Sequence, residues 1–155
     1  MTEDELVKKT LETSKTIAMV GVSSIKKEIS TNIRRRPSII VMKYMQEFGY
    51  RVIPVNPFSA GEKIHGETIV AKLNDIKIPV DIVDVFRPSK EAPVIAEDAV
   101  KIGAKVFWLQ YGIENDEAKQ TVESKNIFYV SNKCIKQEYQ RLFLKVSPVF
   151  PALKN

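Results

Sequence analysis

The sequence predicts an α/β fold: a single doubly wound domain with a mainly parallel five-stranded sheet and helices on both faces. Five short apolar runs recur along the chain without alternating with polar residues, which is typical of strands covered on both faces. Helical patterns separate these runs. The runs begin about 20 to 35 residues apart, a spacing that indicates right-handed crossover units.

The elements can be assigned in chain order. Thr2 and Glu5 have the spacing of a capping box, so a short helix is expected at the start. Two later helical patterns end at Gly49 and Gly103, each placed as the left-handed residue after a helix. The expected strands are 16–20, 51–55, 80–86, 105–110 and 127–130, and the later helices are 40–48, 94–102, 118–122 and 134–144.

The length of 155 residues suits one domain, and no linker divides the chain. We assign residues 1–145 to the domain and 146–155, which contain two prolines, to an extended C-terminal tail. The first ten residues are acidic and mixed in charge, and no window reaches the ~18 apolar residues of a membrane span. A cytoplasmic protein without a membrane partner is therefore expected, while a protein partner or homo-oligomer is left open.

The composition narrows the ligand classes. The net charge of +5 fits attraction to a polyanion or to a phosphorylated ligand. Cys134 and His65 are each alone of their kind, so a metal site is not expected. His65 has no evident partner and is read as a surface residue.

Small, polar and turn-forming residues follow four of the predicted strands, at the edge where ligands bind in this architecture. Turn formation alone would also explain them. An NAD site is disfavoured, because the second strand ends in Asn56 and Pro57 instead of an acid, and the first loop has a single glycine. No Walker loop and no serine nucleophile with its base is present, so no catalytic residue is predicted.

Arginines near this edge favour anion binding. Arg34, Arg35 and Arg36 precede Ser38, a candidate N-cap, so guanidinium groups and a helix N-terminus converge there. Arg87 directly follows the third strand, and arginine can hold phosphate oxygens in a bidentate manner. The alternative is that these are solvated surface arginines.

Six segments in one order carry a family resemblance: IAMVGVSS, RRPS, GYRVIPVNP, VDIVDVFRPS, GAKVFWLQYGI and KCIKQEYQRL. Over about residues 15–144 the chain resembles the stand-alone CoA-binding domain proteins, which are similar to the CoA-binding domain of succinyl-CoA synthetase alpha subunits. The resemblance implies a Rossmann-like fold. It also implies a nucleotide-binding protein that binds coenzyme A or an acyl-CoA at the carboxyl edge of the sheet, through the ADP and pyrophosphate part of the ligand.

The resemblance also implies site residues. Matching motifs give a first phosphate loop of Gly21, Ser23 and Ser24, and a phosphate site at the second helix with Arg36 and Ser38. They also give a nucleotide pocket that is lined from the next three strand ends by Asn56, Pro57, Arg87, Pro88, Gln110 and Gly112. The segment between Ser24 and Arg36 looks longer than in the family, so which arginine contacts phosphate stays open. The family's Asp-Arg-Cys before the last helix is replaced here by Asn132, Lys133 and Cys134.

Four residues of types that are often buried allow two interpretations each. Asp84, inside an apolar strand, is expected to accept backbone N–H bonds, with ligand contact as the alternative. Cys134 is read as structural, with a redox or acyl-accepting role as the alternative. Phe107 and Trp108 are read as core, with adenine stacking as the alternative.

The sequence thus predicts non-catalytic binding of CoA or an acyl-CoA. Two other functions remain to be compared with it: a nucleic-acid-binding domain that uses the basic segment 25–36, and a nicotinamide-nucleotide-dependent reductase. The basic segment contains no aromatic residue, which disfavours nucleic acid as a partner.

Overall fold

A computed structural model of the chain describes residues 1–23 and 37–145. Its centre is a five-stranded sheet of order β2-β1-β5-β6-β7 in which every neighbouring pair is parallel. All five predicted strands are present, each within two residues of its expected ends. Their bounds are β1 (Thr16–Val20), β2 (Arg51–Val55), β5 (Ile82–Val85), β6 (Val106–Leu109) and β7 (Phe128–Val130).

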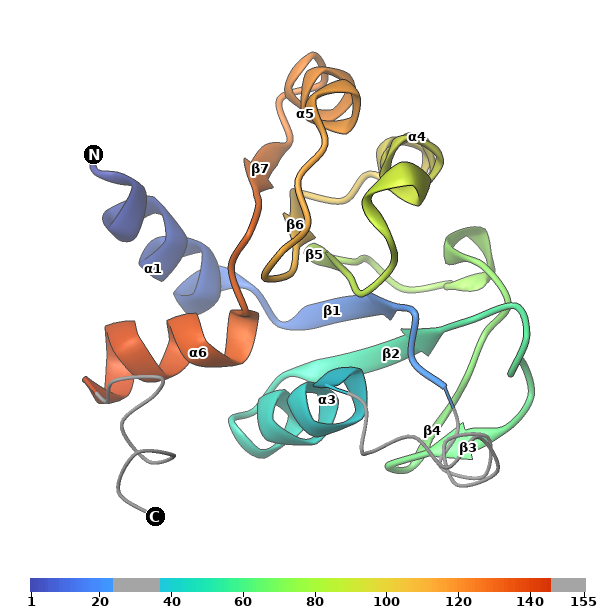
Figure 1. The fold of residues 1–155 in the computed structure, drawn as a ribbon. Helices are drawn as coiled ribbons and strands as arrows, with labels where there is room; N and C mark the ends of the chain where they lie inside the picture. Colours follow the sequence, from blue (N-terminus) through green and yellow to red (C-terminus); the bar gives the residue numbers. More distant parts are fainter. Residues whose placement is uncertain (24–36, 146–155) are drawn as a thin grey trace.

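The strand order creates a switch point. From β1 the chain passes outward to β2, and then returns to the other side of β1 to form β5 (Figure 1). In open α/β sheets the crevice for a ligand lies outside the carboxyl ends of the strands at such a point. The expected ligand edge is therefore the end of β1 and β5.

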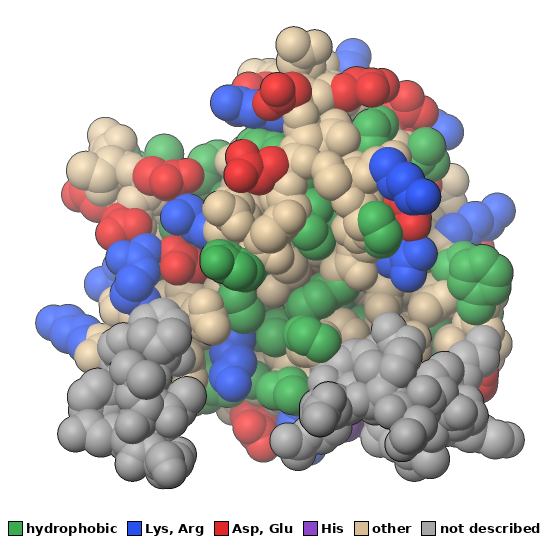
Figure 2. All heavy atoms as spheres, viewed as in Figure 1, with side chains coloured by type: hydrophobic (Ala, Val, Ile, Leu, Met, Phe, Trp, Pro, Cys, Tyr) green, Lys and Arg blue, Asp and Glu red, His purple; other side chains and the backbone are tan. Residues whose placement is uncertain are grey.

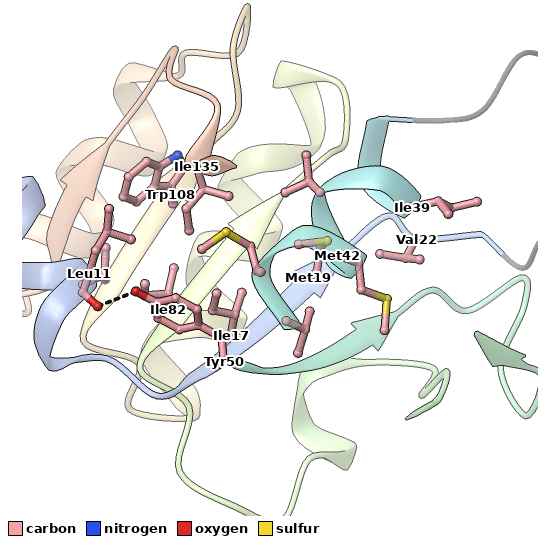
Figure 3. Packing of buried hydrophobic residues seen from close by; sticks show 14 of the residues in the cluster. Leu11, Ile17, Met19, Val22, Ile39, Met42, Tyr50, Ile82, Trp108 and Ile135 are labelled. Atoms are coloured by element: carbon pink, nitrogen blue, oxygen red, sulfur yellow. Dashed lines mark hydrogen bonds between the residues drawn. The ribbon is translucent and has the colours of Figure 1, made fainter. Parts of the chain in front are cut away.

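Helices cover both faces of the sheet, as predicted (Figure 1). Helices α1, α3 and α6 pack with residues such as Met19 and Trp108 on one face, shown in Figure 3. Helices α4 and α5 pack with Val83 and Phe107 on the other. Phe107 and Trp108 are fully buried, so the core interpretation of both is confirmed. The helix bounds are α1 (Glu3–Thr13), α3 (Pro37–Glu47), α4 (Ala92–Lys101), α5 (Asp116–Glu123) and α6 (Ile135–Tyr139), and α6 continues into a π-helical turn, η3 (Gln140–Leu144).

The helix ends test two capping predictions. The capping box at α1 is confirmed, because Thr2 N–H donates to Glu5 Oε1 at 2.8 Å and Glu5 N–H donates to Thr2 Oγ1 at 3.1 Å. The prediction of Ser38 as an N-cap is wrong, because α3 already begins at Pro37. Proline suits a first helical position, where its missing N–H would be unpaired anyway.

The segment after β2 contains more structure than the sequence indicated. It forms a short antiparallel hairpin of β3 (Lys63–Ile64) and β4 (Glu67–Thr68), with His65 at φ 49° in the turn. His65 is half-buried, and its Nε2 lies 3.2 Å from the carbonyl oxygen of Ile39. Two 3-10 turns complete the fold, η1 (Leu73–Asp75) and η2 (Ser89–Glu91).

Two further findings concern residues 1–23 and 37–145. None of the helices in these ranges has the length and apolar character needed to cross a bilayer. The same ranges hold no group of three or more His, Cys, Asp or Glu side chains that could bind a metal ion.

Candidate functional site

Two cavities open at the carboxyl ends of the strands. The β2-side cavity, about 320 Å³, is lined from the ends of β1 and β2 and from α4. The β6-side cavity, about 840 Å³, is lined from the start of α3, the ends of β5 and β6, and the start of α6. Gly21 and Arg87 line both cavities, so these two residues form a saddle between them.

The structure places eight of the eleven predicted site residues around these cavities. Asn56 and Pro57 line the β2-side cavity; Ser38, Pro88, Gln110 and Gly112 line the β6-side cavity; Gly21 and Arg87 line both. Ser23 is half-buried and lines neither cavity. Ser24 and Arg36, like Arg34, Arg35 and the proposed tail, lie outside the described residues.

Gly21 allows β1 to end directly against the loop after β5. Its φ is +107°, and a Cβ atom added there would lie 2.7 Å from the carbonyl oxygen of Phe86 and 3.0 Å from Arg87 Cδ. Its N–H donates to the carbonyl oxygen of Val55 at 2.8 Å. A side chain at the saddle would be strained and would force the backbone at Phe86 to shift, which explains why glycine stands at this one position of a loop that otherwise lacks it.

Arg87 is held in place by Glu91, one turn further along. Its Nε donates to Glu91 Oε1 at 3.0 Å and its Nη2 to Glu91 Oε2 at 2.8 Å. These hydrogen bonds raise the pKa of Arg87 and lower the pKa of Glu91. Both side chains are a little over one third exposed, and the described residues give Nη1 no partner. The guanidinium is thus oriented at the saddle with N–H groups still available to an anion.

Asn56 shapes the β2-side cavity through its backbone and its side chain. Its Oδ1 accepts the N–H of Phe58 at 2.8 Å, and its own N–H donates to the carbonyl oxygen of Val70 at 2.9 Å. The second bond brings the chain beyond the hairpin back to β2, so that Lys72 joins the lining. Phe58, which is 76% exposed, lines the same cavity.

Sequence reasoning missed Phe58 and Lys72. Phe58 directly follows the Asn56-Pro57 pair and could have been found as a large apolar residue in a turn. Lys72 lies more than ten residues further on, in a segment with no motif. Only the parallel bridge between Val55 and Val70 places it at this edge.

Gln110 and Asn132 organise the β6-side cavity. Gln110 is 5% exposed, and its Oε1 accepts the N–H of Ile135, the first residue of α6, at 3.2 Å. Asn132 Oδ1 accepts the N–H of Gly112 at 2.7 Å, and Asn132 itself has φ 58°. An aspartate at this position could accept the same bond.

Asp84 differs from its expectation. It is fully buried beside Met19 and Trp108 in the sheet register, and neither carboxylate oxygen has a hydrogen-bond partner among the described residues. The expectation that it accepts backbone N–H bonds is therefore wrong. Burial raises the pKa of Asp84 well above its usual range, because the ionised form would lose its hydration without compensation.

Comparison with known proteins identifies the family of the chain. The chain matches a family model described as a CoA binding domain over residues 15–140. The chain belongs to this CoA-binding domain family. Every residue lining the two cavities, from Val20 to Gln137, lies inside the segment that matches the family.

Individual relatives of the CoA-binding domain family cover most of the chain. The uncharacterized protein YneT of Bacillus subtilis is 39% identical over 130 residues, which are 84% of this chain and 89% of YneT. The structure of cell-free ID.343 from Thermus thermophilus is 36% identical, with a TM-score of 0.82 over 92% of this chain and 100% of that one. A hypothetical protein from Pyrococcus horikoshii is 35% identical, with a TM-score of 0.81 over 91% and 92%.

Proposed function

We propose that this protein binds coenzyme A or an acyl-CoA across the two cavities and performs no chemistry on it by itself. The observation that carries the proposal is the saddle: two cavities meet at Gly21 and Arg87, at the carboxyl ends of β1 and β5. An extended ligand with a doubly charged centre fits this shape. CoA is such a ligand, because its pyrophosphate separates a flat nucleoside from a long pantetheine arm.

Each cavity suits one end of CoA. The β2-side cavity is the smaller and is lined by apolar groups such as Pro57, Phe58 and Leu73, which suit a purine ring. Lys72 at its wall supplies a charge for the 3′-phosphate. The β6-side cavity is more than twice as large and takes the flexible pantetheine arm.

The same geometry disfavours NAD. An NAD site needs a free acceptor oxygen at the end of the second strand for the ribose hydroxyls. Here the second strand is followed by Asn56, an amide that carries no negative charge and whose Oδ1 accepts the N–H of Phe58, and the nearby charge is the positive charge of Lys72. A reductase would also show an absorbance change during turnover with an added nicotinamide cofactor, which we do not expect.

Nucleic acid is likewise disfavoured as a partner. A nucleic-acid site usually presents a continuous basic stripe. On the face drawn in Figure 2, the Lys and Arg side chains of the described residues are mixed with Asp and Glu around the rim. The basic segment 25–36 lies outside the described residues. Affinity for duplex or single-stranded nucleic acid that falls steeply with salt would support this alternative.

Thermal melting with four ligands tests the proposal. We expect CoA to raise the melting temperature most, dephospho-CoA to raise it less, and NAD and NADP to leave it unchanged. Lys72→Gln should reduce the difference between CoA and dephospho-CoA. Lys77→Gln, at an exposed lysine that lines neither cavity, is the matched control and should leave that difference intact. Indifference to all four ligands would refute CoA binding.

A further inference from the structure

We propose that the segment 146–155 docks on an aromatic face of its own chain, formed by Tyr44 of α3, Phe48 just after α3, Tyr139 of α6 and Phe143 of η3. This inference goes beyond the proposed function and does not depend on CoA binding. It is carried by the contacts and exposure of the four rings, by the geometry of the chain at Lys145, and by a proline pattern in the segment.

The aromatic face is a chain of ring contacts that joins α3 to α6. The ring centroid of Phe48 lies 4.7 Å from that of Tyr44 and 4.9 Å from that of Tyr139. Tyr139 in turn stacks on Phe143, with centroids 4.7 Å apart and ring planes at 23°. Aromatic pairs attract each other at such distances. The rings therefore hold one another in place and present a preformed surface.

The middle of the aromatic face is open, while its two ends are covered by lysines. Lys136 Nζ lies 5.2 Å from the ring centroid of Tyr44, and Lys8 Nζ lies 5.5 Å from that of Phe143. Phe48, between these ends, is 40% exposed. A hollow of about 220 Å³ beside it is lined in part by Phe48 and Phe143. An exposed apolar patch of this kind is typical of a surface that binds another apolar segment.

The segment after Lys145 has the composition of a ligand for such a surface. It reads VSPVFPALKN, in which Pro148 and Pro151 form a P-x-x-P pattern around Phe150, and a single lysine is its only charged side chain. P-x-x-P segments favour the polyproline II conformation and bind grooves lined by aromatic rings. Two prolines at this spacing are about 9 Å apart in that conformation, so each can contact a different ring.

The geometry at Lys145 brings the segment within reach of the rings. Lys145 ends η3 in a left-handed conformation, with φ 56°, and its N–H donates to the carbonyl oxygen of Gln140. A left-handed residue at this position ends a helix. Phe143 lies two residues before Lys145, and Pro148 is at most about 11 Å beyond it. A tether this short gives an effective concentration on the order of millimolar, which favours the face of the same chain over that of a second copy.

Docking at the aromatic face connects the segment to the β6-side cavity. The rings come from α3, from the residue after it, and from α6 with η3, and both helices also line that cavity. Helix α3 does so through Pro37 and Ser38, and α6 through Gln137. The docked segment therefore stabilises the helices that form two walls of the cavity.

Nuclear magnetic resonance on the isotope-labelled full chain tests this inference. We expect the backbone order parameters of Val149 and Phe150 to approach about 0.85, the value of rigid backbone. Nuclear Overhauser contacts should link Phe150 to the rings of Phe48 and Tyr139. Phe48→Ala should lower the two order parameters below about 0.6, the range of flexible backbone. Val94→Ala, at a 65% exposed residue of α4 on the other face of the sheet, is the matched control and should leave them unchanged.

Two results would overturn the inference. The first is order parameters below about 0.6 for Val149 and Phe150 in the unmodified chain. The second is contacts of Phe150 with the aromatic face that arise only between differently labelled chains in a mixed sample, because the occupant would then be a second copy. If Phe48→Ala does not fold, Phe150→Ala tests the same contact from the segment, and an unchanged order parameter at Val149 would refute it.

Discussion

The substitution Gly21→Ala tests the saddle between the two cavities. At φ +107° an alanine is strained by about 1 to 3 kcal/mol. Its methyl group would also lie 2.7 Å from the carbonyl oxygen of Phe86. That carbonyl cannot retreat freely, because Phe86 N–H donates to the carbonyl oxygen of Val20 at 2.8 Å and ties this loop to β1. Relieving such overpacking costs about 1 to 3 kcal/mol more.

The two contributions add to about 2 to 6 kcal/mol in the free energy of unfolding. The middle of that range, about 4 kcal/mol, corresponds to roughly 8 to 16 °C in melting temperature for a chain of this size. Urea unfolding followed by circular dichroism measures it. Gly49→Ala is the matched control, since its φ of +98° is similar but no atom lies within 4 Å of the added Cβ. We expect Gly49→Ala to lose only the strain contribution. Equal losses for the two variants would show that the contact with Phe86 does not restrict the saddle.

Three further predictions concern charged groups. Because the pKa of buried Asp84 is raised, the folded chain keeps a proton on Asp84 above about pH 4, where the unfolded chain has released it. The contribution of Asp84 to stability therefore falls as the pH rises toward the folded pKa. Asp84→Asn should remove this fall in urea midpoints measured from about pH 4 to about pH 8. The pH dependence expected from Asp81 has the opposite sign. Burial acts against its ionised form, but hydrogen bonds from the N–H groups of Lys15 and Thr16 lower its pKa. The stabilisation from Asp81 is therefore present above about pH 4 and is lost as the pH falls through the folded pKa. Asp81→Asn should cost about 1 to 2 kcal/mol at pH 7 and flatten the acid side of the same profile. Glu91→Gln keeps an acceptor for the Arg87 guanidinium but removes a negative charge beside the saddle. Calorimetry should therefore show CoA binding a few-fold more tightly, while the free energy of unfolding changes by less than about 1 kcal/mol. Weaker binding would show that the charge of Glu91 is needed.

The sheet was predictable because parallel strands buried on both faces give continuous apolar runs. The run TIAMV matches β1 residue for residue, and the capping box at Thr2 and Glu5 specified the start of α1. The hairpin of β3 and β4 was not predictable, because each strand has two residues and is too short to show a period.

The site was predictable where residues follow a strand directly. Gly21, Asn56, Arg87 and Gln110 each come at or just after a strand end, and all four line a cavity. Lys72 could not be found in this way, because tertiary pairing of Val70 with β2 brings it to the edge. The error at Asp84 has a related cause.

A strand pattern shows that a carboxylate will be buried, but not whether a donor will reach it. At Asp84 the neighbours in the sheet register are Met19 and Trp108, and the Trp108 N–H is already used by Lys133. The side chain is therefore left without a partner among the described residues.

Isothermal titration of the protein with CoA tests the central claim most directly. The account predicts saturable binding of one CoA per chain. It also predicts that adenosine 3′,5′-bisphosphate competes for the β2-side cavity, and that Gly21→Ala weakens the binding. A flat titration at CoA concentrations up to the millimolar range would contradict the account.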